Sequence, residues 1–354
     1  MTIYLRIDEP ELLRFTREMF EAAGVPPTNA LTVAENLVAG EVHGLASHGP
    51  SRLLIPYVQR FVEGGTNADP QLRLVSQSRG CAVVDGDNGP GAVVGKFAME
   101  QAISLAREHG SGWVSVRNST HFGPAFVYGR MAAAQDMIGF SSTNSVAMVA
   151  PWGGRTKALG TNPICVAVPG LKTSGITLDM ATTVVARGKV QVAALEGKDI
   201  PLGWALDDDG NPTTDPNRAA QMVPVGEYKG YGLALLVDVF CALLSGAAIS
   251  ADIGHLFSGS DQPQGMGHFF GAMDIAAFGP VTAFKARVDE LVATMKANPP
   301  RDGFDQVLVP GEPELLKANE YRAKGIPMAE DVVEQMNTFA AKLHVAPLQA
   351  RDSA

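Results

Sequence analysis

The spacing of apolar and polar residues predicts that the chain begins with three helices. Residues 8–24 repeat apolar side chains at helical intervals and start with Asp8, a residue type that caps helices. A second helix is expected over residues 28–42, and a third from Pro50 to the glycine pair at 64–65. The polar stretch "HGLASHG" is therefore predicted to join two helices.

The pattern changes near residue 80, where short β-type runs alternate with helical runs. The segments "GCAVVDGD", "GWVSVRN" and "IGFSSTN" are predicted as strands, and "GAVVGKFAMEQAISLAREHG" and "PAFVYGRMAAAQDM" as the helices between them. This alternation predicts an α/β fold in which helices pack on a sheet.

The second half of the chain is expected to begin with turns and end with helices. Residues 151–225 are rich in Gly, Pro and Thr, which predicts short strands and turns. Residues 231–250 form a long apolar run, but Asp238 in its middle disfavours a membrane span and favours a buried central helix. The segment "GFDQVLVPGEPE" (303–314) is expected to be a strand followed by a loop, before a helical end.

Composition narrows the class of protein. The 354 residues are 46% apolar and carry a net charge of −9 without a long run of one sign. Nucleic acids and acidic membranes bind clustered Lys and Arg, so neither is an expected partner. The three cysteines are widely spaced, which predicts neither a disulfide framework nor a zinc site. The acidic start differs from a signal peptide, so a cytoplasmic location is expected.

The helix joint supplies the first candidate site. Ser47 and His48 precede Pro50, which suits the first turn of the third helix. Arg52 falls in that turn, where the positive end of the helix dipole disfavours a cation unless an anion binds it. The group is a candidate carboxylate clamp with an adjacent proton donor or acceptor. A surface arginine and a capping serine are the alternative.

Two predicted strand ends supply the second candidate site. His121 comes just after the end of one strand, and Asn144 and Ser145 lie at the end of the next. Ligands of α/β proteins gather beyond the carboxyl ends of strands and at helix N-termini, which makes these residues candidates. Helix caps and a hydrogen-bonded structural histidine would also explain them.

Three further motifs are weaker candidates. They are "LGTNP" (159–163), "LDMATT" (178–183) and "GEYKGYG" (226–232). Asp179 at a strand end could accept hydrogen bonds from ribose hydroxyls, and Lys229 before an apolar helix could meet a phosphate. Each could equally be part of a turn or a cap.

The glycines after the first predicted strand exclude one nucleotide-binding mode. Gly89, Gly91 and Gly95 give the pattern G-x-G-x-x-x-G, one residue longer than the Rossmann fingerprint. The sequence also contains no Walker loop, no GxSxG elbow and no histidine pair with helical metal spacing. A redox enzyme of this sequence must bind its nucleotide in another way.

In order along the chain, the motifs resemble those of the second malate/L-lactate dehydrogenase family. The resemblance runs from "HGLASHG" through "GGTN", "NSTHFG", "PWGG", "GTNP", "LDMATT" and "GNPTTDP" to "KGYGL" and "GFDQVLVPGEPE". It implies a non-Rossmann α/β fold, NADH or NADPH as cofactor, no metal, and a homodimer. It also implies a helical substrate and cover region formed by residues 1–75 with about 300–354, and a cofactor-binding α/β region over about 76–299.

The resemblance also implies roles for individual residues. Ser47 and His48 would relay a proton at the substrate, Arg52 would bind the substrate carboxylate, and Thr161 would contact the substrate. Either His48 or His121 could be the acid–base group. The residues expected to line the cofactor are His121, Phe122, Gly123, Pro124, Ala125, Ser145, Asp179, Met180, Ala181, Lys229, Gly230, Gly311 and Glu312.

One departure from the family separates two possible activities. Imino-acid reductases of the family carry aspartate in a "GDV" motif, and this chain has Lys189 within "RGKV". The expected activity is therefore that of an NAD(P)-dependent 2-hydroxy-acid dehydrogenase, with NAD favoured, and an imino-acid or keto-sugar-acid reductase is the alternative. A catalytically inert nucleotide-binding protein is disfavoured because His48, His121 and Lys229 are all present. Tyr57 is left without a role because its spacing from Arg52 is one residue longer than usual in the family.

Overall fold

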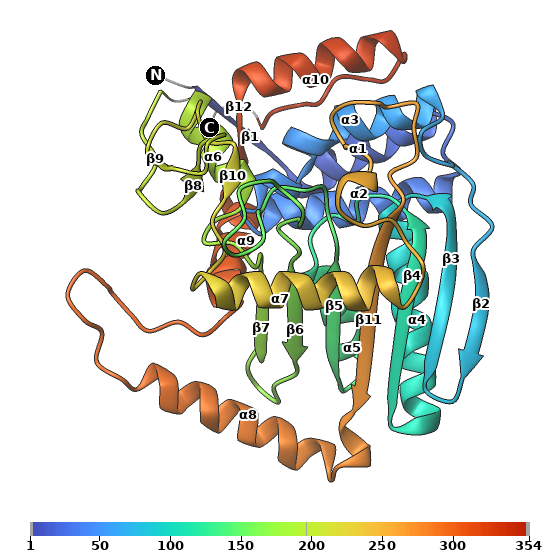
Figure 1. Ribbon diagram of the computed structural model, residues 1–354, viewed down its shortest axis with the longest axis vertical. Helices are drawn as coiled ribbons and strands as arrows, with labels where there is room; N and C mark the ends of the chain where they lie inside the picture. Colours follow the sequence, from blue (N-terminus) through green and yellow to red (C-terminus); the bar gives the residue numbers. More distant parts are fainter. Residues whose placement is uncertain (1–2, 196, 352–354) are drawn as a thin grey trace.

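A seven-stranded sheet forms the centre of the computed structural model, which describes residues 3–195 and 197–351 (Figure 1). In spatial order its strands are β2 (Arg73–Ser78), β3 (Cys81–Gly89), β4 (Ser111–Ser119), β11 (Met266–Asp274), β5 (Met137–Thr143), β6 (Ile164–Val168) and β7 (Ile176–Met180). The predicted α/β fold is confirmed, and the three predicted strands are β3, β4 and β5.

The strand directions bring four strand ends to one edge of the sheet. Only β3 and β4 pair in parallel, and the other neighbours pair antiparallel. Strands β3, β4, β5 and β7 consequently run in the same direction. Their carboxyl ends, at Gly89, Ser119, Thr143 and Met180, lie at a common edge. A mainly antiparallel sheet differs from the parallel sheet of a Rossmann fold.

Helices cover both faces of the sheet (Figure 1). On one face lie α4 (Gly91–His109) and α5 (Phe126–Ala133), and on the other α7 (Tyr228–Asp238), which continues into a π-helical turn at Val239–Leu243. Strand β4 approaches α4 so closely that a Cβ atom on Gly112 would lie 2.0 Å from the main-chain oxygen of Ala102. The absence of a side chain there permits the contact.

A helical layer lies beyond the edge where the four strands end. It contains α1 (Glu9–Ala22), α2 (Pro27–Val42), α3 (Pro50–Glu63), α9 (Glu312–Lys324) and α10 (Glu330–Lys342). The first and last parts of the chain also pair directly, as β1 (Tyr4–Ile7) against β12 (Ile326–Ala329). Phe15, Phe20, Leu37, Leu54 and Met336 belong to one fully buried apolar core in this layer. The predicted domain boundaries remain a prediction.

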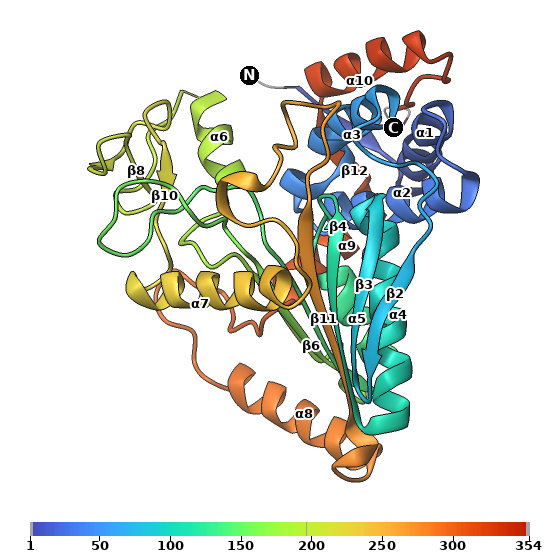
Figure 2. The ribbon, with the colours of Figure 1, turned by 45° about the vertical axis from the view of Figure 1, so that its right-hand side comes forward.

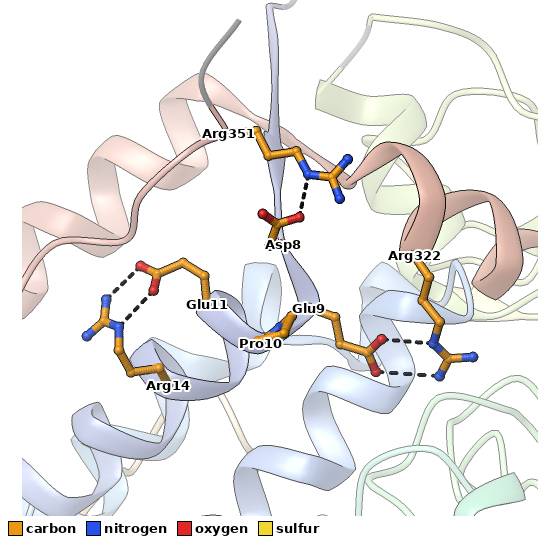
Figure 3. A pocket seen from close by; sticks show the side chains of 7 residues that line it. All are labelled: Asp8, Glu9, Pro10, Glu11, Arg14, Arg322 and Arg351. Atoms are coloured by element: carbon orange, nitrogen blue, oxygen red, sulfur yellow. Dashed lines mark hydrogen bonds and ion pairs between the residues drawn. The ribbon is translucent and has the colours of Figure 1, made fainter. Parts of the chain in front are cut away.

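Ion pairs connect the start of α1 to α9 and to Arg351 near the end of the chain (Figure 3). The paired side chains line a surface hollow of about 570 Å³. Asp8 was the expected side-chain cap of α1, but it makes no cap hydrogen bond. It pairs instead with Arg351. Glu9 pairs with Arg322 of α9 at 2.8 Å. The carboxylates are thus used for tertiary contacts, and the expected cap was wrong.

Two predicted elements differ from the structure. The run 231–250 is not a buried central helix: it is part of α7 and the π-helical turn, and Leu236 and Leu243 are half exposed or more. The segment 303–314 contains no strand, since Pro310 has no N–H to donate and its carbonyl accepts only the Thr177 N–H at the edge of β7.

The remaining elements lie at the periphery. The helix α6 (Arg187–Leu195) and the small sheet β8 (Ala205–Leu206), β9 (Pro212–Thr213) and β10 (Gln221–Met222) lie beyond the strand ends, beside the helical layer (Figures 1 and 2). The helix α8 (Val281–Lys296) extends away from the helical layer at the opposite end of the molecule (Figure 2). Neither α8 nor the central strand β11 was predicted.

The contact at Gly112 gives a stability prediction. We expect Gly112→Ala to lower the free energy of unfolding by about 1–3 kcal/mol, because the added methyl group must displace the backbone of α4. Urea unfolding followed by circular dichroism measures the change. An unchanged midpoint would contradict the close packing of α4 on β4.

Candidate active site

A cavity of about 940 Å³ lies where the helical layer meets the strand ends. Its walls come from the α2–α3 joint, the ends of β4, β5 and β7, helix α6 and the loop around Phe257. Its size is that of a ligand or cofactor site. Residues separated by more than a hundred positions in the sequence therefore face one space.

Most of the residues singled out from the sequence line this cavity. The lining residues among them are Ser47, His48, Arg52, His121, Phe122, Gly123, Pro124, Ala125, Ser145, Thr161, Asp179, Met180 and Ala181. Lys229, Gly230, Gly311 and Glu312 do not line it. Gly230 is buried at the start of α7, and Glu312 pairs with Lys296 of α8 at 2.5 Å. The cofactor role expected for these four residues stays a prediction.

Two imidazole rings stack at the centre of the site. The ring centroids of His48 and His121 are 5.7 Å apart, and the ring planes differ by 21°. His48 lies in the short 3₁₀ helix Ala46–His48, and its Nδ1 is 2.9 Å from the Ser47 hydroxyl. The first and second candidate sites are therefore parts of one site.

Tyr57 is a member of the site that the sequence left without a role. Its hydroxyl lies 2.6 Å from Nδ1 of His121 and 3.0 Å from the His121 main-chain oxygen. The main-chain N–H of His121 donates to the side-chain oxygen of Gln264 at 3.0 Å. Helical spacing puts Tyr57 on the inner face of α3 with Leu53 and Leu54, but only the fold reveals the imidazole beside it.

His268 is a second residue that the sequence did not reveal. It is fully buried on β11 and bonds the Thr143 hydroxyl through Nδ1 and the Ser119 hydroxyl through Nε2, both at 2.8 Å. Its ring also stacks on Phe122, with centroids 4.9 Å apart. His268 thereby joins the ends of β4 and β5 immediately behind the cavity wall. No motif around it signals this contact.

The environment lowers the pKa of both central histidines. Burial is the main cause, and it brings the pKa of His48 to about 4 and that of His121 to about 3. The positive charge of Arg52 lowers both pKa values further. Both rings are therefore neutral at pH 7. An anion that neutralises Arg52 would raise both values and favour protonation.

Arg52 is half-buried and forms no ion pair within the described part of the chain. Its guanidinium donates to the side-chain oxygen of Gln191 on α6 and lies 5.1 Å above the ring of Phe257. Burial, and then the charge of Arg187, lowers its pKa. A half-buried cation that faces a cavity without a carboxylate partner favours an anionic ligand.

The opposite wall offers groups suited to a nucleotide. Asp179 at the end of β7 accepts the Phe126 N–H at 2.8 Å through one oxygen, and desolvation by the surrounding protein raises its pKa to about 6, although the residue keeps solvent exposure at the cavity. Gly123 has φ +73°, and a Cβ atom there would lie 1.9 Å from the Asn36 side-chain oxygen. The Ser145 hydroxyl accepts the Thr161 N–H at 3.1 Å. A cavity of this size, bordered by the Asp179 carboxylate and closely held backbone, fits a dinucleotide.

No group of three or more His, Cys, Asp or Glu side chains in the described residues is arranged to hold a metal ion. Over the same residues, no helix has the length and apolar character needed to cross a bilayer.

Comparisons with known proteins identify the family. The malate/L-lactate dehydrogenase family model matches residues 7–337. The chain is 38% identical to the malate dehydrogenase of Pyrococcus horikoshii, over 98% of this chain and 97% of the relative. It is also 38% identical to the L-sulfolactate dehydrogenase of Methanocaldococcus jannaschii, over 92% and 94% of the two chains.

Solved structures agree with the sequence comparison. The structure of the Pyrococcus horikoshii malate dehydrogenase has a TM-score of 0.89 at 35% identity, over 98% of this chain and 97% of that chain. A Δ1-piperideine-2-carboxylate reductase from Pseudomonas syringae has a TM-score of 0.84 at 28% identity, over 95% and 99%.

The chain belongs to the malate/L-lactate dehydrogenase family. It is accordingly a dehydrogenase of hydroxy acids that uses a nicotinamide cofactor, as the motifs predicted.

Glu41 supports the helix joint from behind. It is buried on α2, and its carboxylate accepts the Ser51 N–H at 3.0 Å in the first turn of α3. Gly49 passes so close that a Cβ atom there would lie 2.1 Å from the carboxylate. Burial raises the pKa of Glu41 to about 7. The backbone between His48 and Arg52 is thus held by a carboxyl group that titrates near neutrality.

Glu41 gives a pH-dependent stability prediction. Because its pKa is raised from 4.5 to about 7 on folding, the unfolded chain loses this proton first, and stability falls as the pH rises from 4.5 to 7. Glu41→Gln cannot lose that proton, and its oxygen can still accept the Ser51 N–H. We expect Glu41→Gln to be more stable than wild type by up to about 3 kcal/mol at pH 8 and nearly equal at pH 4.5.

Urea unfolding of both proteins at the two pH values provides the measurement. A stability difference that is the same at pH 4.5 and pH 8 would show that Glu41 does not titrate as a buried group.

Proposed function

We propose that this enzyme interconverts a small 2-hydroxy acid and its 2-oxo acid, with the cavity as its active site. The observation that carries the proposal is the convergence of Arg52, His48 and His121 on one space. Arg52 binds the substrate carboxylate and orients the reacting carbon. A histidine supplies the proton to the oxygen of the oxo group during reduction and removes it during oxidation. The bound nicotinamide supplies or accepts the hydride.

The substrate is proposed to carry a second anionic group, as oxaloacetate and sulfopyruvate do. On α6, Lys189, Val192 and Ala193 recur at helical intervals and line the cavity. Lys189 is exposed and forms no ion pair within the described residues, so its ammonium is available to a ligand. Relatives named malate and sulfolactate dehydrogenases support the same choice.

The rival activity, reduction of a cyclic imine, is supported by the similarity to the piperideine carboxylate reductase structure. The positive charge of Lys189 disfavours the reduction of a cyclic imine. A protonated imine carries positive charge, and Lys189 would repel it in a cavity that already contains Arg52.

NAD is the proposed cofactor in preference to NADP. Asp179 has one carboxylate oxygen engaged by the Phe126 N–H and a second able to accept a ribose hydroxyl. Ionised Asp179 beside that ribose would repel a 2′-phosphate. The three cysteines are free, which suits a reducing compartment, and the enzyme is proposed to work in the cytoplasm.

A substrate panel tests the proposed activity. We expect NADH oxidation with oxaloacetate or sulfopyruvate, slower oxidation with pyruvate, and lower kcat/KM with NADPH. Arg52→Ala should raise KM for every oxo acid by about 10- to 100-fold, as expected when a hydrogen bond to a charged group is lost. Lys189→Ala should raise KM for the dianionic acids and leave KM for pyruvate unchanged.

Pyruvate is thus the matched control for the lysine variant. Turnover of a cyclic imino acid without turnover of any oxo acid would overturn the hydroxy-acid assignment.

We further propose that the enzyme is a homodimer joined through the outer face of α7 and the π-helical turn. Leu235, Leu236, Phe240, Leu243 and Leu244 are between 36% and 63% exposed on consecutive turns, an apolar surface larger than scattered single residues provide. A second copy of this surface would cover it, because most soluble oligomers are symmetric.

The dimer proposal predicts an effect of charge on this face. Leu236→Glu should give a monomer in analytical ultracentrifugation, because a carboxylate would be buried without a partner. Leu74→Glu, on the edge strand β2, is the control and should remain dimeric. A monomeric wild type, or a dimer in both variants, would exclude this interface.

A further inference from the structure

The contacts of His121 are unequal on its two ring nitrogens. Nδ1 is surrounded by protein groups: the Tyr57 hydroxyl at 2.6 Å and the Gly123 N–H at 3.3 Å. Nε2 has no hydrogen-bond partner among the described residues, and the ring lines the cavity. Substrate oxygen must therefore approach His121 at Nε2.

The proton on Nδ1 follows from the donors and acceptors around Tyr57. The hydroxyl has one proton, and the His121 carbonyl at 3.0 Å can only accept it. If the hydroxyl donates there, its oxygen accepts Nδ1–H, and both groups are satisfied. If the hydroxyl instead donates to an unprotonated Nδ1, the single lone pair of Nδ1 must accept both the Tyr57 hydroxyl and the Gly123 N–H. The His121 carbonyl then has no hydrogen bond from the hydroxyl. The first arrangement gives up only the long contact from the Gly123 N–H.

We propose that Tyr57 is a positioning residue that keeps the proton of neutral His121 on Nδ1, so that Nε2 presents a lone pair to the substrate hydroxyl. The inference rests on the proposed function and assigns the acid–base role to His121. During oxidation the substrate C–H bond breaks and its hydride would go to the oxidised nicotinamide of the proposed function, the O–H proton passes to Nε2 of His121, and the carbon–oxygen double bond forms. Reduction reverses each step, and imidazolium returns the proton to the oxygen.

The surroundings keep Tyr57 suited to this task. Tyr57 is 7% exposed, and burial raises its pKa far above the ordinary value, so the hydroxyl stays protonated throughout the working pH range. It lies on α3, the helix that also carries Arg52. The same rigid element therefore orients the imidazole and binds the substrate carboxylate. His48 differs, because the Ser47 hydroxyl at its Nδ1 can donate or accept and fixes neither tautomer.

Tyr57→Phe tests the proposal because it removes only the hydroxyl. We expect kcat for oxidation of the hydroxy acid to fall by about 10- to 100-fold, part of the usual contribution of an acid–base group, with KM for the nicotinamide unchanged. Tyr128→Phe is the matched control. Its hydroxyl is also buried and bonds the main-chain oxygen of Phe122, next to His121, but touches no imidazole. The control should retain kcat within about threefold.

The tautomer itself can be measured without turnover. In wild-type enzyme labelled with ¹⁵N-histidine, long-range proton–nitrogen spectra report which ring nitrogen carries the proton, and His121→Gln identifies the signal. We expect protonated Nδ1 in His121 at pH 7. A proton on Nε2, or full kcat in Tyr57→Phe, would overturn the proposal. Failure of all oxo acids to react would instead contradict the proposed function. The two outcomes are distinguishable, because the tautomer of His121 is measured without turnover.

Discussion

The contact between the helical layer and the strand-end edge of the sheet is the constraint on which the site depends. Tyr57 and His48 come from the α2–α3 region, and His121 follows β4. The hydrogen bond between the Tyr57 hydroxyl and His121, and the stacking of the His48 and His121 rings, form only if the helical layer and the sheet edge keep a fixed relative position. Buried Glu41 beneath the joint and buried His268 behind the sheet edge support the two sides of this contact. A displacement of about 1 Å at such a site is sufficient to impair catalysis.

The mainly antiparallel sheet explains how the proposed nucleotide site forms without a Rossmann fingerprint. Strands β4, β5 and β7 end at one edge although β11 and β6 run between them in the opposite direction. The carboxyl ends therefore converge as they do in a parallel sheet, but the loops that follow them are held by side chains. Asp179 and Ser145 bond main-chain N–H groups across these loops. These side-chain hydrogen bonds fix the loops at the sheet edge, a role that the glycine-rich turn has in a Rossmann fold.

Local patterns predicted much of the fold, and long-range contacts account for what was missed. Helices α1 to α4 and strands β3 to β5 were predicted because apolar periodicity and the prolines and glycines that bound these elements act within a few residues. Strand β11 was missed although it occupies the centre of the sheet, because its pairing with β4 and β5 joins residues more than 120 positions apart. The outer face of α7 was predicted to be buried, because an apolar run alone does not indicate whether the same chain or a second molecule packs against it. Motif order indicated thirteen residues that line the cavity, but Tyr57 required coordinates.

The central claim is that one cleft brings the substrate carboxylate to Arg52 and the reacting carbon to His121. A crystal structure of the enzyme with NADH and oxamate, an unreactive analogue of a 2-oxo acid, tests it most directly. The account predicts the oxamate carboxylate on the Arg52 guanidinium, its amide oxygen within hydrogen-bond distance of His121 Nε2, and the nicotinamide C4 facing the same carbon. A carboxylate bound away from Arg52, or a nicotinamide ring outside the cavity, would contradict the account.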